Sequence, residues 1–82
     1  MMSSATVWLA EDEAAIADTL LYVLQQEGFT PRWFSRGLPL LEALQQQRPD
    51  LVILDVGLPD INGFALCRQL LAQHPSLPVL FL

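Results

Sequence analysis

The pattern of hydrophobic and polar positions divides the chain into segments that are typical of strands and of helices, in alternating order. The central segment is a run of four large apolar residues at 51–54, which is typical of a strand buried on both faces of a parallel sheet. The run stops at Asp55, and residues 56–63 contain two glycines, a proline and an asparagine, which predicts an irregular loop before a helix that starts at Phe64. In open α/β sheets, ligands bind at the carboxyl ends of the strands, so this aspartate marks a candidate site.

The same alternation extends over the rest of the chain after a short polar lead at residues 1–5. Apolar runs predict further strands, and amphipathic patterns with a period of about 3.6 residues predict helices between them. Pro31 lies within the second strand and favours an edge position, because proline cannot donate a ladder hydrogen bond. The predicted elements are strand 6–10, helix 13–26, strand 30–34, helix 38–47, strand 51–54, helix 64–74 with Asn62 as its N-cap, and strand 77–82.

Strands that alternate with helices in this way imply parallel pairing through right-handed crossovers. We therefore predict an α/β fold with helices on both faces of a parallel sheet. A chain of 82 residues forms at most one small domain, and its hydrophobic content of 52% is high for that length. We therefore expect the hydrophobic core of these residues to belong to a larger body.

Charge and composition exclude several functional classes. The net charge is −5 and the four arginines are scattered, so no basic stripe is available for a nucleic acid backbone. The sequence has no secretory leader and no apolar run of the roughly 20 residues that a membrane span requires, so we expect a cytoplasmic location. Cys67 is the only cysteine, which excludes an intramolecular disulfide, and we expect it in the core.

Candidate chemistry comes from acidic residues at the ends of two strands. The first strand ends at Glu11 and Asp12, and neighbouring strands lie about 4.8 Å apart, so these side chains would meet Asp55 in one crevice. Carboxylates crowded together are stabilised by a proton or by a hard cation, and Mg²⁺ takes one or two carboxylates with water and backbone oxygens. We expect a Mg²⁺ site that includes the backbone carbonyl of Gly57, with Asp55 as a nucleophile that could accept a phosphoryl group.

Structural roles for the same residues remain open at this stage. Asp12 could cap the helix that follows it, and an aspartate at the end of a strand is common without any function. His74 lies at a helix end, where a positive charge suits the helix dipole, and we expect it to be structural. We expect Trp8 and Trp33 to fill space between sheet and helices.

The acidic cluster at 11–13, Asp55 closing the segment LVILD, and the following Pro59 and Gly63 together resemble the receiver domain of two-component response regulators. The resemblance covers essentially all 82 residues. It implies a flavodoxin-like (CheY-like) three-layer fold with strand order 2-1-3-4, ending before a fifth strand. It also implies phosphorylation of Asp55 by a sensor histidine kinase.

The resemblance assigns further roles to this sequence. Glu11 and Asp12 match the acidic pair that manages Mg²⁺, with Asp12 the more direct, and Gly57 matches the position that supplies a backbone carbonyl. The module would signal rather than act as an enzyme, and would control transcription through a C-terminal DNA-binding domain that these residues do not include.

Departures from the family pattern limit these expectations. Members have a hydroxyl residue after strand four and a lysine after strand five that hold the phosphoryl oxygens, whereas this sequence contains no lysine and all its threonines precede Asp55. We expect poor phosphotransfer by the 82 residues alone, because two charge-assisted hydrogen bonds would be missing. We also expect a homodimer or strand exchange through the exposed edge of the strand at 79–82.

Two other functions are compatible with parts of the same pattern. A haloacid-dehalogenase-like phosphatase also uses a nucleophilic aspartate after a strand, but its pattern requires a second aspartate where Gly57 stands. The other alternative is a phosphorylation-independent interaction module that keeps the fold without the chemistry. The acidic residues at 11, 12 and 55 argue against that module.

Overall fold

The computed structural model describes residues 4–82, and the first three residues of the polar lead lie outside the described part. Strands and helices alternate through it, so the predicted order of elements is confirmed. The elements are β1 Thr6–Ala10, α1 Ala14–Gln26, β2 Thr30–Phe34, α2 Gly37–Ala43, β3 Leu51–Leu54, α3 Gly63–Gln73 and β4 Val79–Phe81.

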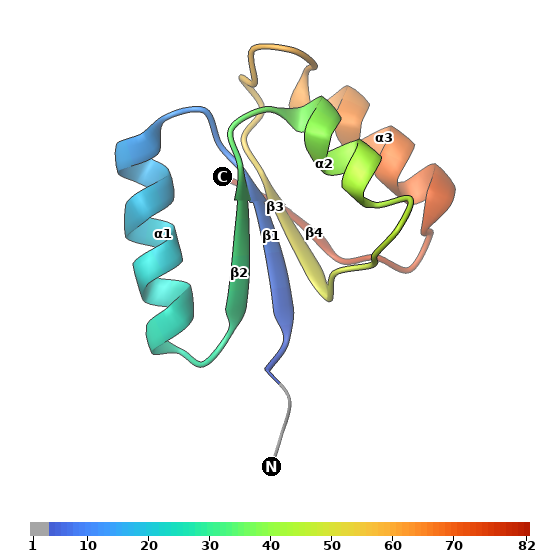
Figure 1. The fold of residues 1–82 in the computed structure, drawn as a ribbon. Coiled ribbons are helices and arrows are strands. Elements are labelled where there is room, and N and C mark those ends of the chain that lie inside the picture. The colour runs from blue at the N-terminus through green and yellow to red at the C-terminus, as the bar shows by residue number, and fades with distance from the viewer. Residues whose placement is uncertain (1–3) are drawn as a thin grey trace.

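The strands form one parallel sheet in the order β2-β1-β3-β4, as predicted (Figure 1). β2, which contains Pro31, lies at an edge, where the missing backbone donor of proline does little harm. β1 and β3 are neighbours in the interior of the sheet. Ala10 lies opposite Leu54 at their carboxyl ends, so the residues that follow these two positions emerge side by side.

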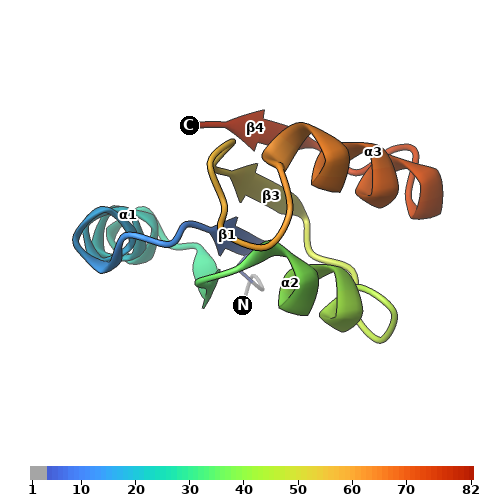
Figure 2. The ribbon, with the colours of Figure 1, turned by 90° about the horizontal axis from the view of Figure 1, so that it is seen from above.

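The helices cover the two faces of the sheet unequally, with α1 on one face and α2 and α3 on the other (Figure 2). Side chains alternate between the faces of a strand, which divides the core into two clusters. The cluster under α2 and α3 is the larger and contains Trp8, Phe34, Leu40, Leu44, Val52, Leu54, Leu66 and Leu70. The cluster under α1 contains Val7, Leu9, Ala17 and Ile53. This is the predicted three-layer arrangement.

Helix α2 ends at Ala43, four residues before the predicted end at Gln47. The N–H groups of Gln45 and Gln46 bond to carbonyls three residues back, so the chain tightens into turns after the helix. The glutamines are exposed and have no apolar side to pack against the sheet. Pro49 also disfavours helical geometry at the residue before it, which helps to end the helix early.

Smaller predictions about single residues met different outcomes. The N-cap prediction for α3 is confirmed, since the side chain of Asn62 accepts a hydrogen bond from the N–H of Phe64 at 2.8 Å. Cys67 is half-buried and packs against the larger core cluster. Trp8 is buried as predicted, but the prediction that Trp33 fills space between sheet and helices was wrong, because its side chain is 36% exposed.

Within residues 4–82, none of the helices combines the length and apolar character needed to cross a bilayer.

Candidate functional site: an acidic cluster at the carboxyl edge of the sheet

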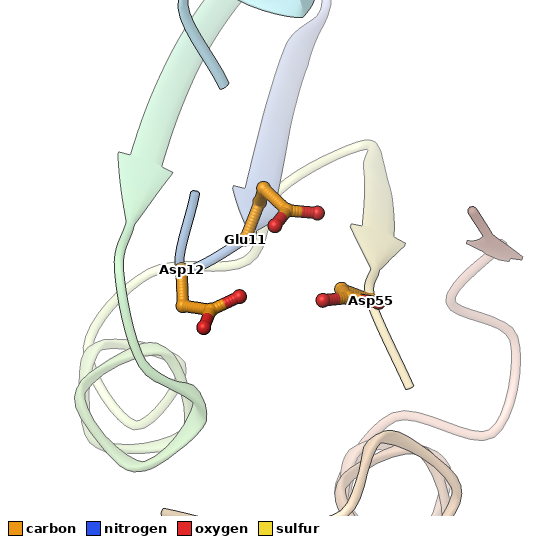
Figure 3. Close-up of side chains that lie close together, drawn as sticks. All are labelled: Glu11, Asp12 and Asp55. Atoms are coloured by element: carbon orange, nitrogen blue, oxygen red, sulfur yellow. The ribbon is translucent and has the colours of Figure 1, made fainter. Parts of the chain in front are cut away.

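Three carboxylates meet at the edge of the sheet where β1 and β3 end. Glu11 and Asp12 directly follow β1, and Asp55 directly follows β3. One carboxylate oxygen from each residue lies within 4.8 Å of the others. Figure 3 shows the side chains of Asp12 and Asp55 pointing toward one another, with Glu11 beside them. We call these three residues the acidic cluster, and their predicted convergence is confirmed.

Glu11 is the buried member of the acidic cluster, with 3% of its surface exposed. Its Oε1 accepts a hydrogen bond from the N–H of Glu13 at 3.0 Å. Burial raises the pKa of Glu11 above its ordinary value, and the nearby charges of Asp55 and Asp12 raise it further, while the bond from Glu13 opposes them. A buried carboxylate beside two other acidic groups favours the binding of a proton or of a cation.

Asp12 and Asp55 have carboxylates that the fold leaves largely available. Asp12 is exposed and does not cap α1, because Glu13 occupies the N-cap position and no side chain bonds there. The interpretation of Asp12 as a helix cap was therefore wrong. The backbone N–H of Asp55 continues the ladder to the carbonyl of Ala10 at 3.0 Å, whereas its Oδ1 receives only a long contact of 3.4 Å from the N–H of Gly57. Both side chains can accept a ligand.

Gly63 holds the backbone beneath Asp55, a role that the sequence pattern did not indicate. Its N–H donates to the carbonyl of Val56 at 2.9 Å and closes the loop between β3 and α3. A Cβ at this position would lie 2.5 Å from the carbonyl oxygen of Asp55 and 2.7 Å from the Cα of Val56. Any larger residue would displace the backbone that carries Asp55.

Gly57 has a different environment from the one that its predicted role assumed. The predicted site uses the backbone carbonyl of Gly57, and a tight turn that presents this carbonyl would be easiest for glycine. Among the glycines of residues 4–82, only Gly28 has a positive φ, and a Cβ built on Gly57 would meet nothing within 4 Å. Glycine is therefore not required at 57 for steric reasons, and the role of its carbonyl as a ligand stays a prediction.

Two further residues fix the loops around the acidic cluster. The indole Nε1 of Trp33 donates to the carbonyl of Glu11 at 2.7 Å. The carboxylate of Asp60 accepts hydrogen bonds from the N–H groups of Gly37 and Leu38, at the start of α2. Their partners lie 22 or 23 residues away in the sequence, so no local pattern could have revealed these contacts.

Comparison with known proteins decides the family. The model of the response regulator receiver domain matches residues 7–82. The chain belongs to the response regulator receiver domain family. This receiver domain is 68% identical over 81 residues to the transcriptional regulatory protein CreB of Escherichia coli strain K12, a match that covers 99% of the chain and 35% of CreB. The chain thus spans about a third of the length of that relative.

Solved structures agree with the assignment to receiver domains. The chemotaxis response regulator CheY4 of Vibrio cholerae superposes with a TM-score of 0.90 at 26% identity, over 95% of this chain and 67% of that one. A structure described as a transiently phosphorylated switch in bacterial signal transduction has a TM-score of 0.84 at 33% identity, over 99% of this chain and 65% of that one. The resemblance inferred from the acidic motifs is confirmed, and the phosphatase alternative is not supported.

Proposed function

We propose that Asp55 is the phosphoryl acceptor of this receiver domain and that the acidic cluster binds Mg²⁺ for the transfer. The observation that carries the proposal is the meeting of three carboxylates from two strands within 4.8 Å. Oxygen ligands of this kind suit Mg²⁺, which keeps several waters and takes few protein carboxylates. The likeness to a structure described as a transiently phosphorylated switch also supports it.

The proposed reaction uses the carboxylate of Asp55 as a nucleophile. One of its oxygens attacks the phosphorus of a phosphohistidine on a sensor histidine kinase, the P–N bond breaks, and the imidazole leaves with the electron pair of that bond. Bound Mg²⁺ supplies positive charge that lets two anionic groups approach. Asp12, whose side chain is exposed, would contact the ion directly. Glu11 is buried beside it and would add negative charge, and the carbonyl of Gly57 is the proposed backbone ligand.

Roles of the whole protein are proposals as well, because the chain covers 35% of CreB. We propose residues 1–82 as the N-terminal part of a cytoplasmic response regulator that controls transcription. DNA contact would be made by a separate C-terminal domain, since these residues carry a net charge of −5. The sensor histidine kinase would be the phosphodonor.

A titration with Mg²⁺ followed by calorimetry tests the metal site. We expect saturable binding that weakens about tenfold in Asp55→Asn and in Asp12→Asn, because each substitution removes a charge that faces the ion. Asp18→Asn, which removes the same charge from an exposed position on α1, should bind like the unchanged chain. Equal affinity in all four proteins would refute the site and favour the phosphorylation-independent interaction module.

Incubation with a small phosphodonor and Mg²⁺ tests the acceptor. We expect a single phosphate adduct, located at Asp55 by peptide mapping and absent from Asp55→Asn. The occupied fraction should be well below one per chain, because the 82 residues contain no lysine to hold the phosphoryl oxygens. A stoichiometric adduct would refute the expectation of poor transfer, and an adduct on another residue would refute the role of Asp55.

We also propose that the outer edge of β4 mediates a homodimer or strand exchange between two chains. β4 is an edge strand, and its outer backbone groups can pair with another strand. The apolar side chains at its end, Leu80, Phe81 and Leu82, are 55%, 41% and 53% exposed. An apolar edge of this kind is suited to pairing with a second copy.

A further inference from the structure

Both backbone polar groups of Glu11 are held by β2. The N–H of Glu11 donates to the carbonyl of Phe34 at 3.0 Å, and the carbonyl of Glu11 accepts the indole N–H of Trp33 at 2.7 Å. The regular pairing of β1 with β2 ends at Ala10 opposite Phe34. The indole therefore binds a carbonyl that lies beyond the last paired residue of β1.

The carbonyl of Glu11 belongs to the peptide unit that leads into Asp12. A peptide unit is planar, so fixing its oxygen also fixes the direction in which the chain enters Asp12. Asp12 itself is exposed, and its side chain interacts with that of the neighbouring Glu11. The direction of its carboxylate toward Asp55, visible in Figure 3, thus depends on the backbone that precedes it.

We propose that Trp33 is a positioning residue of the cation site: its indole N–H orients the Glu11–Asp12 peptide so that the carboxylate of Asp12 faces Asp55. This inference rests on the proposed Mg²⁺ site and assigns Trp33 a role in its affinity. A ligand group that is already oriented loses less conformational freedom when the ion binds, which strengthens binding without any new contact. Because the indole bonds directly to this peptide, the environment of the indole changes when the ion binds.

The substitution Trp33→Phe tests the affinity. It keeps an aromatic ring on β2 and removes the N–H donor. We expect the dissociation constant for Mg²⁺ to rise about three- to tenfold, the effect of one hydrogen bond, in a chain whose circular dichroism spectrum is unchanged. Binding within twofold of the unchanged chain would overturn the inference.

Thr6→Val is the matched control for a lost hydrogen bond. The hydroxyl of Thr6 donates to Asp50 at 3.1 Å, at the opposite end of β1 from the acidic cluster. The same hydroxyl accepts the N–H of Asp50 at 3.1 Å, so Thr6→Val loses two hydrogen bonds where Trp33→Phe loses one, and a general loosening of the sheet would weaken Mg²⁺ binding at least as much in Thr6→Val. We expect weaker binding only in Trp33→Phe, and equal weakening in both would overturn a positioning role.

Nuclear magnetic resonance tests the inference on the unchanged chain, and a variant is needed only to assign the indole N–H signals. The indole N–H signal that disappears in Trp33→Phe is that of Trp33, and the remaining indole signal is that of Trp8. We expect the signal of Trp33 to move on addition of MgCl₂ with the dissociation constant found by calorimetry, and to move further than that of Trp8. If Trp33→Phe fails to fold, a conservative change at Phe34, whose ring packs against that of Trp8 with centroids 5.4 Å apart, identifies the signal of Trp8 and so assigns the other indole signal to Trp33.

The outcomes separate this inference from the proposed function. Saturable Mg²⁺ binding with a stationary Trp33 signal, or with equal affinity in Trp33→Phe, would overturn the positioning role and leave the Mg²⁺ site intact. Absence of Mg²⁺ binding in the unchanged chain would overturn both proposals.

Discussion

The carboxylate of Asp60 accepts a hydrogen bond from the backbone N–H of Gly37 at 2.9 Å, across 23 residues of sequence. Its second oxygen accepts the N–H of Leu38 at 2.8 Å. Arg36, at the N-cap position of α2, makes no side-chain cap bond. Asp60 thus caps α2 from the loop that follows Asp55, and it ties the β2–α2 turn to the candidate site.

Removal of the Asp60 cap should destabilise the chain. We expect Asp60→Ala to lower the free energy of unfolding by about 1–2 kcal/mol, because two N–H groups at the start of α2 lose their acceptor. Asp60→Asn should lose less, since its amide oxygen still accepts one bond. Urea unfolding at pH 7 measures both, with Asp18→Asn as a control for the loss of an exposed charge. Equal stability of Asp60→Ala and Asp18→Asn would contradict the capping role.

The hydrogen bonds of Asp60 also predict that the stability of the fold depends on pH. Partial burial of Asp60 opposes its ionisation, but the hydrogen bonds from Leu38 and Gly37 outweigh this and hold its pKa below the ordinary value of 3.8. A carboxylate with a lowered pKa in the folded state stabilises the fold above pH 3.8, and this stabilisation is lost as the pH falls through the lower folded value. We expect the cost of Asp60→Ala to shrink when unfolding is measured well below pH 3.8.

The pH dependence of stability expected from Glu11 is opposite to that expected from Asp60. The pKa of Glu11 is raised above 4.5, first by burial and then by the charges of Asp55 and Asp12, so the folded state loses stability as the pH rises from 4.5 through the raised value. In the absence of divalent ions, Glu11→Gln should raise the free energy of unfolding at pH 7 by about 1 kcal/mol, the repulsion of two charges about 4 Å apart in water. The gain should disappear below pH 4.5. Thermal unfolding at both pH values measures it.

A control and a further outcome sharpen this prediction. Glu27→Gln removes an exposed charge at the end of α1 and should change stability much less at either pH. Addition of Mg²⁺ should reduce the advantage of Glu11→Gln, because the bound ion offsets the repulsion. A destabilising effect of Glu11→Gln at pH 7 without divalent ions would refute the electrostatic account.

The two glycines of the β3–α3 segment should respond differently to alanine. Gly63→Ala should cost about 1–3 kcal/mol and weaken Mg²⁺ binding, because its Cβ would collide with the backbone of Asp55 and Val56. Gly57→Ala should stay within about 0.5 kcal/mol, since nothing lies within 4 Å of the added carbon. Chemical denaturation measures the free energy of unfolding of both variants, and calorimetry measures their affinity for Mg²⁺. Equal effects of the two substitutions would contradict the described packing.

The exposed edge of β4 predicts self-association. Light scattering at increasing concentration should show dimers or larger species, and Leu80→Lys should shift the chain toward monomer, because a charge on an edge strand opposes pairing. Tyr22→Lys introduces the same charge at an exposed position on α1 and should have little effect. A monodisperse monomer of the unchanged chain at high concentration would refute the proposal.

The fold could be predicted from the sequence because apolar runs and helical periodicity depend directly on which residues are buried. The run at 51–54 and the proline in β2 were sufficient to place an inner strand and an edge strand. The end of α2 differs from the prediction, because residues 45–47 have good helix propensity but no apolar side to pack against the sheet, and Pro49 disfavours helical geometry just after them.

The acidic cluster was also accessible, since the ends of neighbouring parallel strands must meet at one edge. The residues that support the acidic cluster could not be predicted. Trp33 and Asp60 act through partners on other segments, and the tight position of Gly63 depends on how the loop folds back over Asp55. Such contacts arise only after the chain has folded, so neither periodicity nor spacing records them.

The strands that carry the acidic cluster are the two inner strands of the sheet, each paired on both sides. Their amide protons should be among the slowest in the chain to exchange with deuterium, because release requires a neighbouring ladder to open. The backbone frame of the site therefore belongs to the most persistent part of the molecule. Fluctuations of the outer strands can occur without dismantling it.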